Sequence, residues 1–118
     1  MEPTTAGAEI VNEAYSLITG DRQNSYSHPA DDYQRTVNIF NAMTGHDLTS
    51  EEGVLFMVAM KLSRLIHEID TGMDLPDNTR DAIGYLGCLN MIRHHYREQE
   101  SEMAHVARHM RKAVREWA

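Results

Sequence analysis

Apolar residues recur at intervals of three and four along most of the chain, and polar residues fill the intervals. This spacing is typical of amphipathic α-helices, and no stretch shows the alternation of apolar and polar positions that marks a strand. The pattern predicts a helix over residues 6–19, a second from Pro29 to near Gly45, a third that opens after Thr49, and a fourth that begins near Pro76. We therefore expect an all-α bundle of four or five helices.

Two of the predicted helices are preceded or opened by residues that commonly cap or begin a helix. Pro29 suits the first position of the second helix, with Ser27 or His28 as its cap. Thr49 followed by Glu52 has the spacing of a capping box, in which each side chain satisfies a free backbone amide of the first turn. These signals locate the starts of the second and third helices.

The third predicted helix carries charges in an unexpected place. Between Val54 and Ile69 the apolar residues lie on every face of a helical period, so we expect this helix to be enclosed by others. Lys61 and Arg64 interrupt the apolar pattern and, being three apart, project from the same side. A cation on an enclosed helix needs either access to water or an anion as its partner.

Acidic residues of the fourth helix are candidates for that anion. Asp77, Asp81 and Tyr85 follow at four-residue spacing and share one stripe. The short connection before this helix makes it an antiparallel neighbour of the third, so the two stripes can meet. The meeting has two interpretations: an ion-pair network that fixes helix register, or a site in which the cations hold phosphate and Asp77 and Asp81 bind a divalent ion. Tyr85 either supports such a site or fills the interface.

The connection between the first two helices, residues 20–29, is a second candidate site. Arg22, Tyr26 and His28 offer a cation, a stacking face and a titratable imidazole within one loop. The free amides at the start of the following helix also favour an anion. A loop fastened by its own polar side chains, with Tyr26 packed on the core, explains these residues equally well.

The fourth helix carries a long apolar repeat whose members alternate spacings of three and four, as in the seam of a heptad repeat. The members are Leu89, Ile92, Tyr96, Gln99, Met103, Val106, Met110, Ala113 and Trp117. A single helix from Asp77 to Trp117 would be about 60 Å long, more than the other helices can cover. We expect the tail either to fold back near residues 98–101 or, as the preferred interpretation, to pair with another copy. Gly84 and Gly87 indicate the close approach of another backbone.

Composition narrows the class of protein. The chain of 118 residues has a formal charge of −7, divided into −9 over residues 1–92 and +2 over residues 93–118. An acidic body argues against general nucleic-acid binding. The one cysteine rules out an internal disulfide framework, and the chain shows neither a secretory signal nor a membrane-spanning stretch, so we expect a cytoplasmic protein.

We expect one domain over residues 1–118, with an irregular end at residues 1–5 and a helical extension at residues 93–118. Two histidines of that extension, His105 and His109, have the four-residue spacing of a metal pair. They lack a third ligand at a fixed spacing, so we interpret them as part of an exposed helix face rather than a zinc site.

Three segments in order along the chain, GDRQNSYSHP, KLSRL and DNTRDAIGYLG, resemble a small all-α family of bacteriophages and their hosts, described only as a domain of unknown function. The resemblance covers residues 8–92. Such domains are distantly similar to MazG-like nucleoside triphosphate pyrophosphohydrolases and to helical domains associated with nucleotide modification in phages. In MazG-like enzymes, acidic residues of two helices hold magnesium around a triphosphate, and oligomers complete one another's cores.

The resemblance implies roles for particular residues. Asp81 stands where the aspartate of the later helix falls, and Asp77 can supply a second carboxylate to Mg²⁺. The paired glutamates of the earlier helix are absent; Lys61 and Arg64 stand there instead, which resembles the nucleotide-modification relatives. The implied function is phage-type nucleotide metabolism. The protein would bind a nucleotide phosphate and, with Mg²⁺, hydrolyse a nucleoside triphosphate to the monophosphate and pyrophosphate. If the protein is phage-encoded, it would act in the host cytoplasm.

In that function Asp77, Asp81 and Lys61 form the catalytic set, and the two aspartates hold the metal. The phosphate and ligand contacts come from Arg22, Tyr26, His28, Lys61, Arg64 and Tyr85. One alternative is a non-catalytic protein that binds or sequesters a nucleotide, because cations without a full metal shell hold phosphate but do not activate water. Another is a structural or adaptor oligomer whose function lies in the heptad seam.

Overall fold

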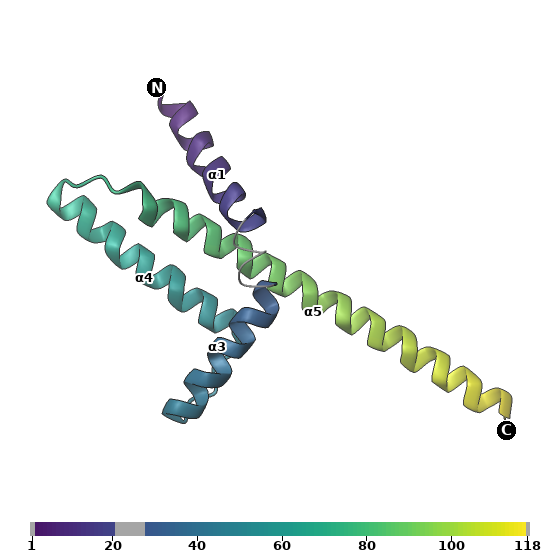
Figure 1. Cartoon of the computed structure of the whole chain (residues 1–118). Helices are drawn as coiled ribbons and strands as arrows, with labels where there is room; N and C mark the ends of the chain where they lie inside the picture. The colour runs from purple at the N-terminus through teal and green to yellow at the C-terminus, as the bar shows by residue number, and fades with distance from the viewer. Residues whose placement is uncertain (1, 21–27, 118) are drawn as a thin grey trace.

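The computed structural model describes residues 2–20 and 28–117, and these residues form helices and no strand. Four helices follow one another in this part of the chain (Figure 1): α1 (Pro3–Thr19), α3 (Pro29–Thr44), α4 (Ser50–Thr71) and α5 (Pro76–Trp117). The all-α class that the apolar spacing predicts is confirmed.

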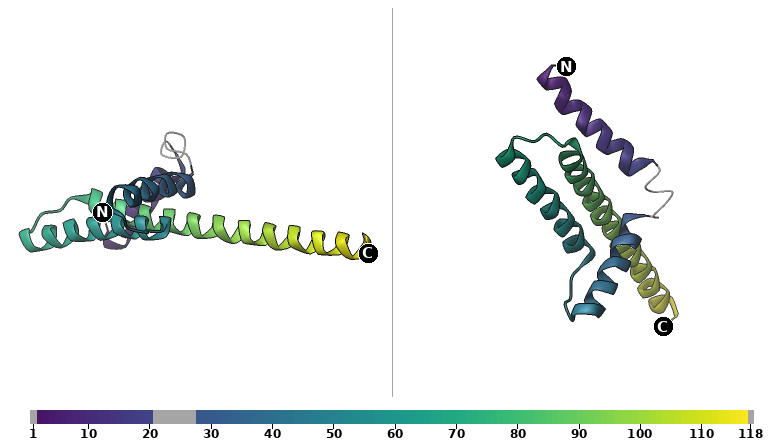
Figure 2. Two further views of the ribbon diagram at one scale, coloured as in Figure 1. Left: turned by 90° about the horizontal axis from the view of Figure 1, so that it is seen from below. Right: turned by 60° about the vertical axis from the view of Figure 1, so that its left-hand side comes forward.

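The centre of the fold is an antiparallel pair formed by α4 and α5, which lie side by side (Figure 1, Figure 2). Gly72 ends α4 in the left-handed conformation, with a φ of 73°. The chain then turns back into α5 at Pro76. Glu68, which is 4% exposed, fastens this turn: its carboxylate accepts hydrogen bonds from the Leu75 amide and, at 3.1 Å, from Asn78 Nδ2.

A small core lies where α3 crosses the α4–α5 pair. Its buried members come from all three helices: Ala30, Tyr33, Val54, Cys88 and Ile92. Three polar side chains link the same helices beside this core. Ser50 Oγ lies 2.8 Å from Tyr96 Oη, and Tyr96 Oη donates to Gln34 Oε1 at 3.2 Å. The first half of α5 is thus held on one side by both α3 and α4.

Among the described helices, α1 packs against α5 alone. Ile18 is part of this contact, and its side chain covers two glycines of α5. A Cβ atom at Gly84 would lie 3.4 Å from Ile18 Cγ2, and one at Gly87 would lie 2.7 Å from Ile18 Cδ1. The predicted close approach to the two glycines is confirmed, but the neighbour is a side chain rather than another backbone.

The helix starts agree with the capping signals, with one exception. His28 Nδ1 accepts a hydrogen bond from the Ala30 amide at 3.0 Å and so caps α3. Thr49 and Glu52 form the capping box, with hydrogen bonds of 3.1 and 3.2 Å. The exception is α1, which begins at Pro3 rather than at residue 6. Proline is favourable in the first turn of a helix, so residues 3–5 are helical, and the predicted irregular end at residues 1–5 is wrong for them.

The prediction that the third helix is enclosed on every face is wrong for the single chain. Only α3 and α5 contact α4 among the described helices, and they cover one side of it. On its other side Phe56, Ile66 and Ile69 are each exposed to 60% or more. Periodicity reports how apolar a face is but not whether a neighbour exists to cover it, and α1, the remaining described helix, packs elsewhere.

α5 is one uninterrupted helix from Pro76 to Trp117. Its second half projects beyond the other helices, and the longest dimension of the molecule is 73 Å (Figure 1, Figure 2). The fold-back near residues 98–101 is therefore wrong, because neither proline nor glycine breaks the helix there. None of the described helices combines the length and apolar character that a membrane crossing requires.

Candidate functional site

Ionisable side chains of α4 and α5 form a connected network across the helix pair. Lys61 Nζ of α4 donates to Asp81 Oδ2 of α5 at 2.9 Å. The other carboxylate oxygen, Asp81 Oδ1, accepts a hydrogen bond from Arg80 Nε at 3.1 Å, and Arg80 Nη1 lies 3.3 Å from Asp77 Oδ1. Two cations and two anions therefore alternate, and the network has no net charge.

The centre of this network is partly shielded from water. The side chains of Lys61 and Asp81 are 12% and 24% exposed, whereas that of Asp77 is 69% exposed. Burial by itself raises the pKa of Asp81, but hydrogen bonds from Lys61 and Arg80 and their positive charges outweigh it. The pKa of Asp81 consequently lies below its ordinary value of 3.8, and the carboxylate is ionised at neutral pH.

Some of the residues predicted to meet are in contact, and others are not. Lys61 and Asp81 form the interhelical pair that the antiparallel arrangement requires. Asp77 does not join Lys61 but lies at the exposed start of α5, one turn before Asp81, so the expected four-residue cluster is wrong for Asp77. Arg64 is exposed and forms no ion pair with a described residue. Of the predicted four, only Lys61 and Asp81 pair with each other across the two helices, and Asp77 instead pairs with Arg80.

Arg80 is the member of the network that the sequence predictions missed. It lies three residues after Asp77, a spacing at which opposite charges on a helix are neighbours, and this was a usable signal. Its contact with the adjacent Asp81 depends on how the long guanidinium side chain folds back along the helix. Sequence spacing does not specify that conformation.

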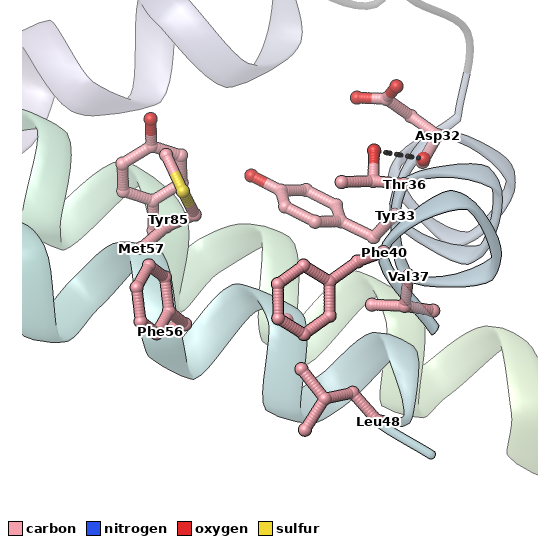
Figure 3. Close-up of a pocket in the computed structure, with 10 residues that line it drawn as sticks. Asp32, Tyr33, Thr36, Val37, Phe40, Leu48, Phe56, Met57 and Tyr85 are labelled. Atoms are coloured by element: carbon pink, nitrogen blue, oxygen red, sulfur yellow. Dashed lines mark hydrogen bonds between the residues drawn. The ribbon is translucent and has the colours of Figure 1, made fainter. Parts of the chain in front are cut away.

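An apolar pocket of about 410 Å³ opens between α3, α4 and α5 (Figure 3). Its size and its largely apolar wall are those of a site for a small molecule. At its rim, Thr36 Oγ1 donates to the backbone oxygen of Asp32 at 2.9 Å. The lining residues are Asp32, Tyr33, Thr36, Val37, Phe40, Leu48, Gly53, Phe56, Met57 and Tyr85. Tyr85, predicted on the stripe of Asp77 and Asp81, thus contributes to the pocket wall.

The pocket and the ion network are neighbours along the helix pair. Met57 lies one helical turn from Lys61 on α4, and Tyr85 lies one turn from Asp81 on α5. Because the helices are antiparallel, both steps lead in the same direction, from the network to the pocket wall. We call the pocket together with Lys61, Arg80 and Asp81 the pocket–cation site. Aromatic rings and two cations are thereby brought to one side of the fold.

The second predicted site, in the loop at residues 20–29, is only partly described. Arg22 and Tyr26 lie outside the described residues. His28 serves as the cap of α3, and its ring centre lies 5.3 Å from that of His95. It does not line the pocket. The roles of Arg22, Tyr26 and His28 toward a ligand therefore stay predictions.

Among the described residues, no three His, Cys, Asp or Glu side chains gather in a group that could hold a metal ion. Asp77 and Asp81 are both engaged by Arg80, and Asp81 also by Lys61. Mg²⁺ prefers six oxygen ligands in octahedral geometry, so these two occupied carboxylates do not fit a site for it in this arrangement. His105 and His109 lie on an exposed stretch of α5, as expected, with ring centres 4.5 Å apart.

The chain matches the family model of a domain of unknown function, DUF6378, over residues 9–93. This chain belongs to that family. The matched residues include the pocket–cation site and end before the projecting half of α5. The chain is also similar to the Gene 55 protein of Mycobacterium phage D29, with 29% identity over 83 residues, which are 70% of this chain and 52% of the phage protein. It therefore spans about half the length of that relative. No solved structure matches the chain.

Proposed function

We propose that this chain is a nucleotide-binding protein of phage-type nucleotide metabolism, and that the nucleotide binds at the pocket–cation site. The observation that carries the proposal is the position of an aromatic-walled pocket one helical turn from the Lys61–Asp81 pair, which Arg80 joins through Asp81. A nucleotide has the same two parts, a flat ring and a phosphate group. Similarity to a mycobacteriophage protein supports the phage setting.

The pocket suits the base of the nucleotide. Tyr33, Phe56 and Tyr85 are among the residues that line it, and stacking of a base on an aromatic ring contributes about 1–3 kcal/mol. Phe56 is 68% exposed, so a bound ring would cover apolar surface that water now contacts. Asp32 and Thr36 at the rim offer polar atoms to the edge of a base.

Three cations of α4 and α5 are candidates for the phosphate: Lys61, Arg64 and Arg80. Arg80 is paired with the exposed Asp77, and an exposed ion pair of this kind contributes only about 0–1 kcal/mol. Phosphate can therefore displace Asp77 from Arg80 at small cost. Arg64 lies three residues after Lys61, forms no ion pair with a described residue, and presents the planar fork that holds phosphate oxygens in pairs.

Hydrolysis of a nucleoside triphosphate with Mg²⁺ is the narrower form of this proposal. Asp77 and Asp81 are the predicted ligands, but each is engaged by cations, so substrate phosphate and water would have to supply most of the metal's oxygen ligands. If the aspartates do hold the ion, Asp81→Asn abolishes turnover while nucleotide binding and the fold persist. Unchanged turnover in this variant would remove Asp81 from the catalytic set.

One chromatographic experiment tests binding and hydrolysis together. The purified protein, in molar excess, is mixed with a panel of ribo-, deoxyribo- and cyclic nucleotides, with and without Mg²⁺. We expect at least one nucleotide to leave the free pool and to return unchanged when the protein is denatured. New monophosphate peaks that require Mg²⁺ would establish the hydrolase. If every nucleotide stays free and intact under both conditions, the proposal is wrong, and the network is an ion-pair lock.

Two surface variants then locate the bound nucleotide. Phe56→Ala should weaken binding of both the nucleoside and the nucleotide, because it removes a wall of the pocket. Arg64→Ala should weaken binding of the nucleotide but not of the nucleoside. Ile66→Ala and Arg108→Ala are matched controls, since both residues are exposed and neither lines the pocket. If the controls change nucleotide affinity as much as Phe56→Ala and Arg64→Ala do, the ligand binds elsewhere.

A further inference from the structure

The projecting half of α5 carries an apolar stripe that no described helix covers. We call its residues the tail seam: Gln99, Met103, Val106, Met110, Ala113 and Trp117. Met103 is 72% exposed, Met110 is 64% exposed and Trp117 is 94% exposed. The stripe continues the heptad spacing of Leu89 and Ile92, which contact the other helices nearer the start of α5. Apolar residues at this spacing are those through which helices pair.

Charges along the same stretch are separated by sign. Glu98, Glu100 and Glu102 come first, and no cation lies among residues 98–102. Arg108, Arg111, Lys112 and Arg115 follow, and no acidic residue lies among residues 105–115. The two segments therefore carry −3 and +4, with the histidines counted as neutral. They lie on either side of residue 105, at nearly equal distances from it.

We propose that the tail seam pairs with the tail seam of a second copy, with the two helices antiparallel and crossing near residue 105. In this orientation the acidic segment of each copy lies along the basic segment of the other. A parallel pair would instead place acidic beside acidic and basic beside basic, which is unfavourable between neighbouring helices. Charge complementarity thus selects both the occupant, a second copy, and its direction.

The antiparallel register also aligns individual positions. Met103 faces Val106 of the second copy, and Met110 faces Gln99, so apolar residues fill the centre. Glu98 and Lys112 of the second copy lie at the same level along the pair, on the outer side of the helices rather than beside the seam, and this match occurs twice because the arrangement is symmetric. Within one chain Glu98 is 3.0 Å from His94 and Lys112 is 3.9 Å from Glu116. All four side chains are at least 66% exposed, so these contacts leave them able to exchange partners.

Reversal of charge in the full-length protein tests the arrangement. Glu98→Lys with Glu102→Lys places like charges along both halves of the antiparallel pair, so we expect dimerisation to weaken roughly tenfold or more in sedimentation velocity runs. Adding Arg108→Glu and Lys112→Glu to the same chain exchanges both segments and should restore the dimer. The matched control is Glu9→Lys with Glu13→Lys, the same change at exposed positions of α1. A wild-type protein that stays monomeric over the concentration series, or a fourfold variant that is not restored, would overturn the proposal.

Cross-linking through single cysteines tests the direction of the second helix. Cys88 is buried and does not compete for an added reagent. Val106→Cys lies beside the crossing point and should cross-link to its own copy with a short bismaleimide. Ala113→Cys should not, because two such residues would be about 25 Å apart along antiparallel helices. Efficient cross-linking of Ala113→Cys would show a parallel pair and refute the antiparallel arrangement. Circular dichroism of each variant reports whether its helices are intact.

Discussion

Glu68 offers a direct test of how the α4–α5 pair is held together. It is a buried carboxylate, 4% exposed, and it accepts hydrogen bonds from the Leu75 amide and from Asn78 Nδ2. Both donors belong to the turn and first residues of α5. The change Glu68→Ala removes both bonds at once and leaves Asn78, which is 8% exposed, without this acceptor.

The expected loss of stability follows from these two bonds. A hydrogen bond to a charged group contributes about 1.5–3 kcal/mol, and a donor that can turn to water recovers part of the loss. The Asn78 amide is buried and recovers little, while the Leu75 amide belongs to an exposed turn and recovers more. We therefore expect Glu68→Ala to lower the free energy of unfolding by about 3 kcal/mol. Glu68→Gln should lower the free energy of unfolding by about half as much. Its side-chain oxygen still accepts one of the two hydrogen bonds, whereas its NH₂ group faces the other donor and cannot accept from it.

Urea unfolding followed by circular dichroism measures this difference. Variants are compared at one protein concentration, because association of the folded chain adds to apparent stability. Asp70→Ala is the matched control: it removes a carboxylate in the last turns of the same helix, but an exposed one. Its effect should stay within about 0.5 kcal/mol. If Glu68→Ala costs no more than Asp70→Ala, the carboxylate does not hold the turn, and the reasoning is refuted.

Two further predictions concern the network and the tail. The lowered pKa of Asp81 means that its ionised form stabilises the folded state above the unfolded pKa, and that this contribution disappears as pH falls through the folded pKa. The difference in unfolding free energy between wild type and Asp81→Asn should thus be largest near neutral pH and shrink below about pH 4, whereas a constant difference in urea titrations would contradict the shift. Truncation after Arg97 should abolish self-association in sedimentation runs yet retain nucleotide binding in the chromatographic assay. A truncated protein that still dimerises would exclude the tail seam as the interface.

The ion network can be interpreted as a structural lock or as part of a binding site, and the two interpretations assign different roles to the same residues. As a lock, Lys61 and Asp81 fix the register of α4 against α5, and removal of either one leaves a partly buried charge without its partner. As part of a binding site, Arg80 must release Asp77 to meet a phosphate. The readings are compatible, because Lys61 can hold the helices in register while the more exposed Arg80 and Arg64 contact the ligand.

The sequence by itself determined the helices, most of their ends, and the meeting of Lys61 with Asp81. Each of these depends on short-range geometry. His28, Thr49 and Glu52 act on amides within three residues of themselves. A short turn between two helices makes them antiparallel, so a cation stripe on one and an acidic stripe on the other are brought together.

Only the tertiary structure decided which faces are covered and where a cavity remains. The pocket draws its walls from three helices, and its existence depends on how side chains of α3 pack across the α4–α5 pair. Glu68 is buried because α5 begins beside it, and a glutamate in a helix is usually exposed. The tertiary structure likewise decides that the apolar faces of α4 and α5 are exposed, because none of the described helices packs against them. Apolar spacing is a property of one helix, but burial depends on whether another helix is there to cover it.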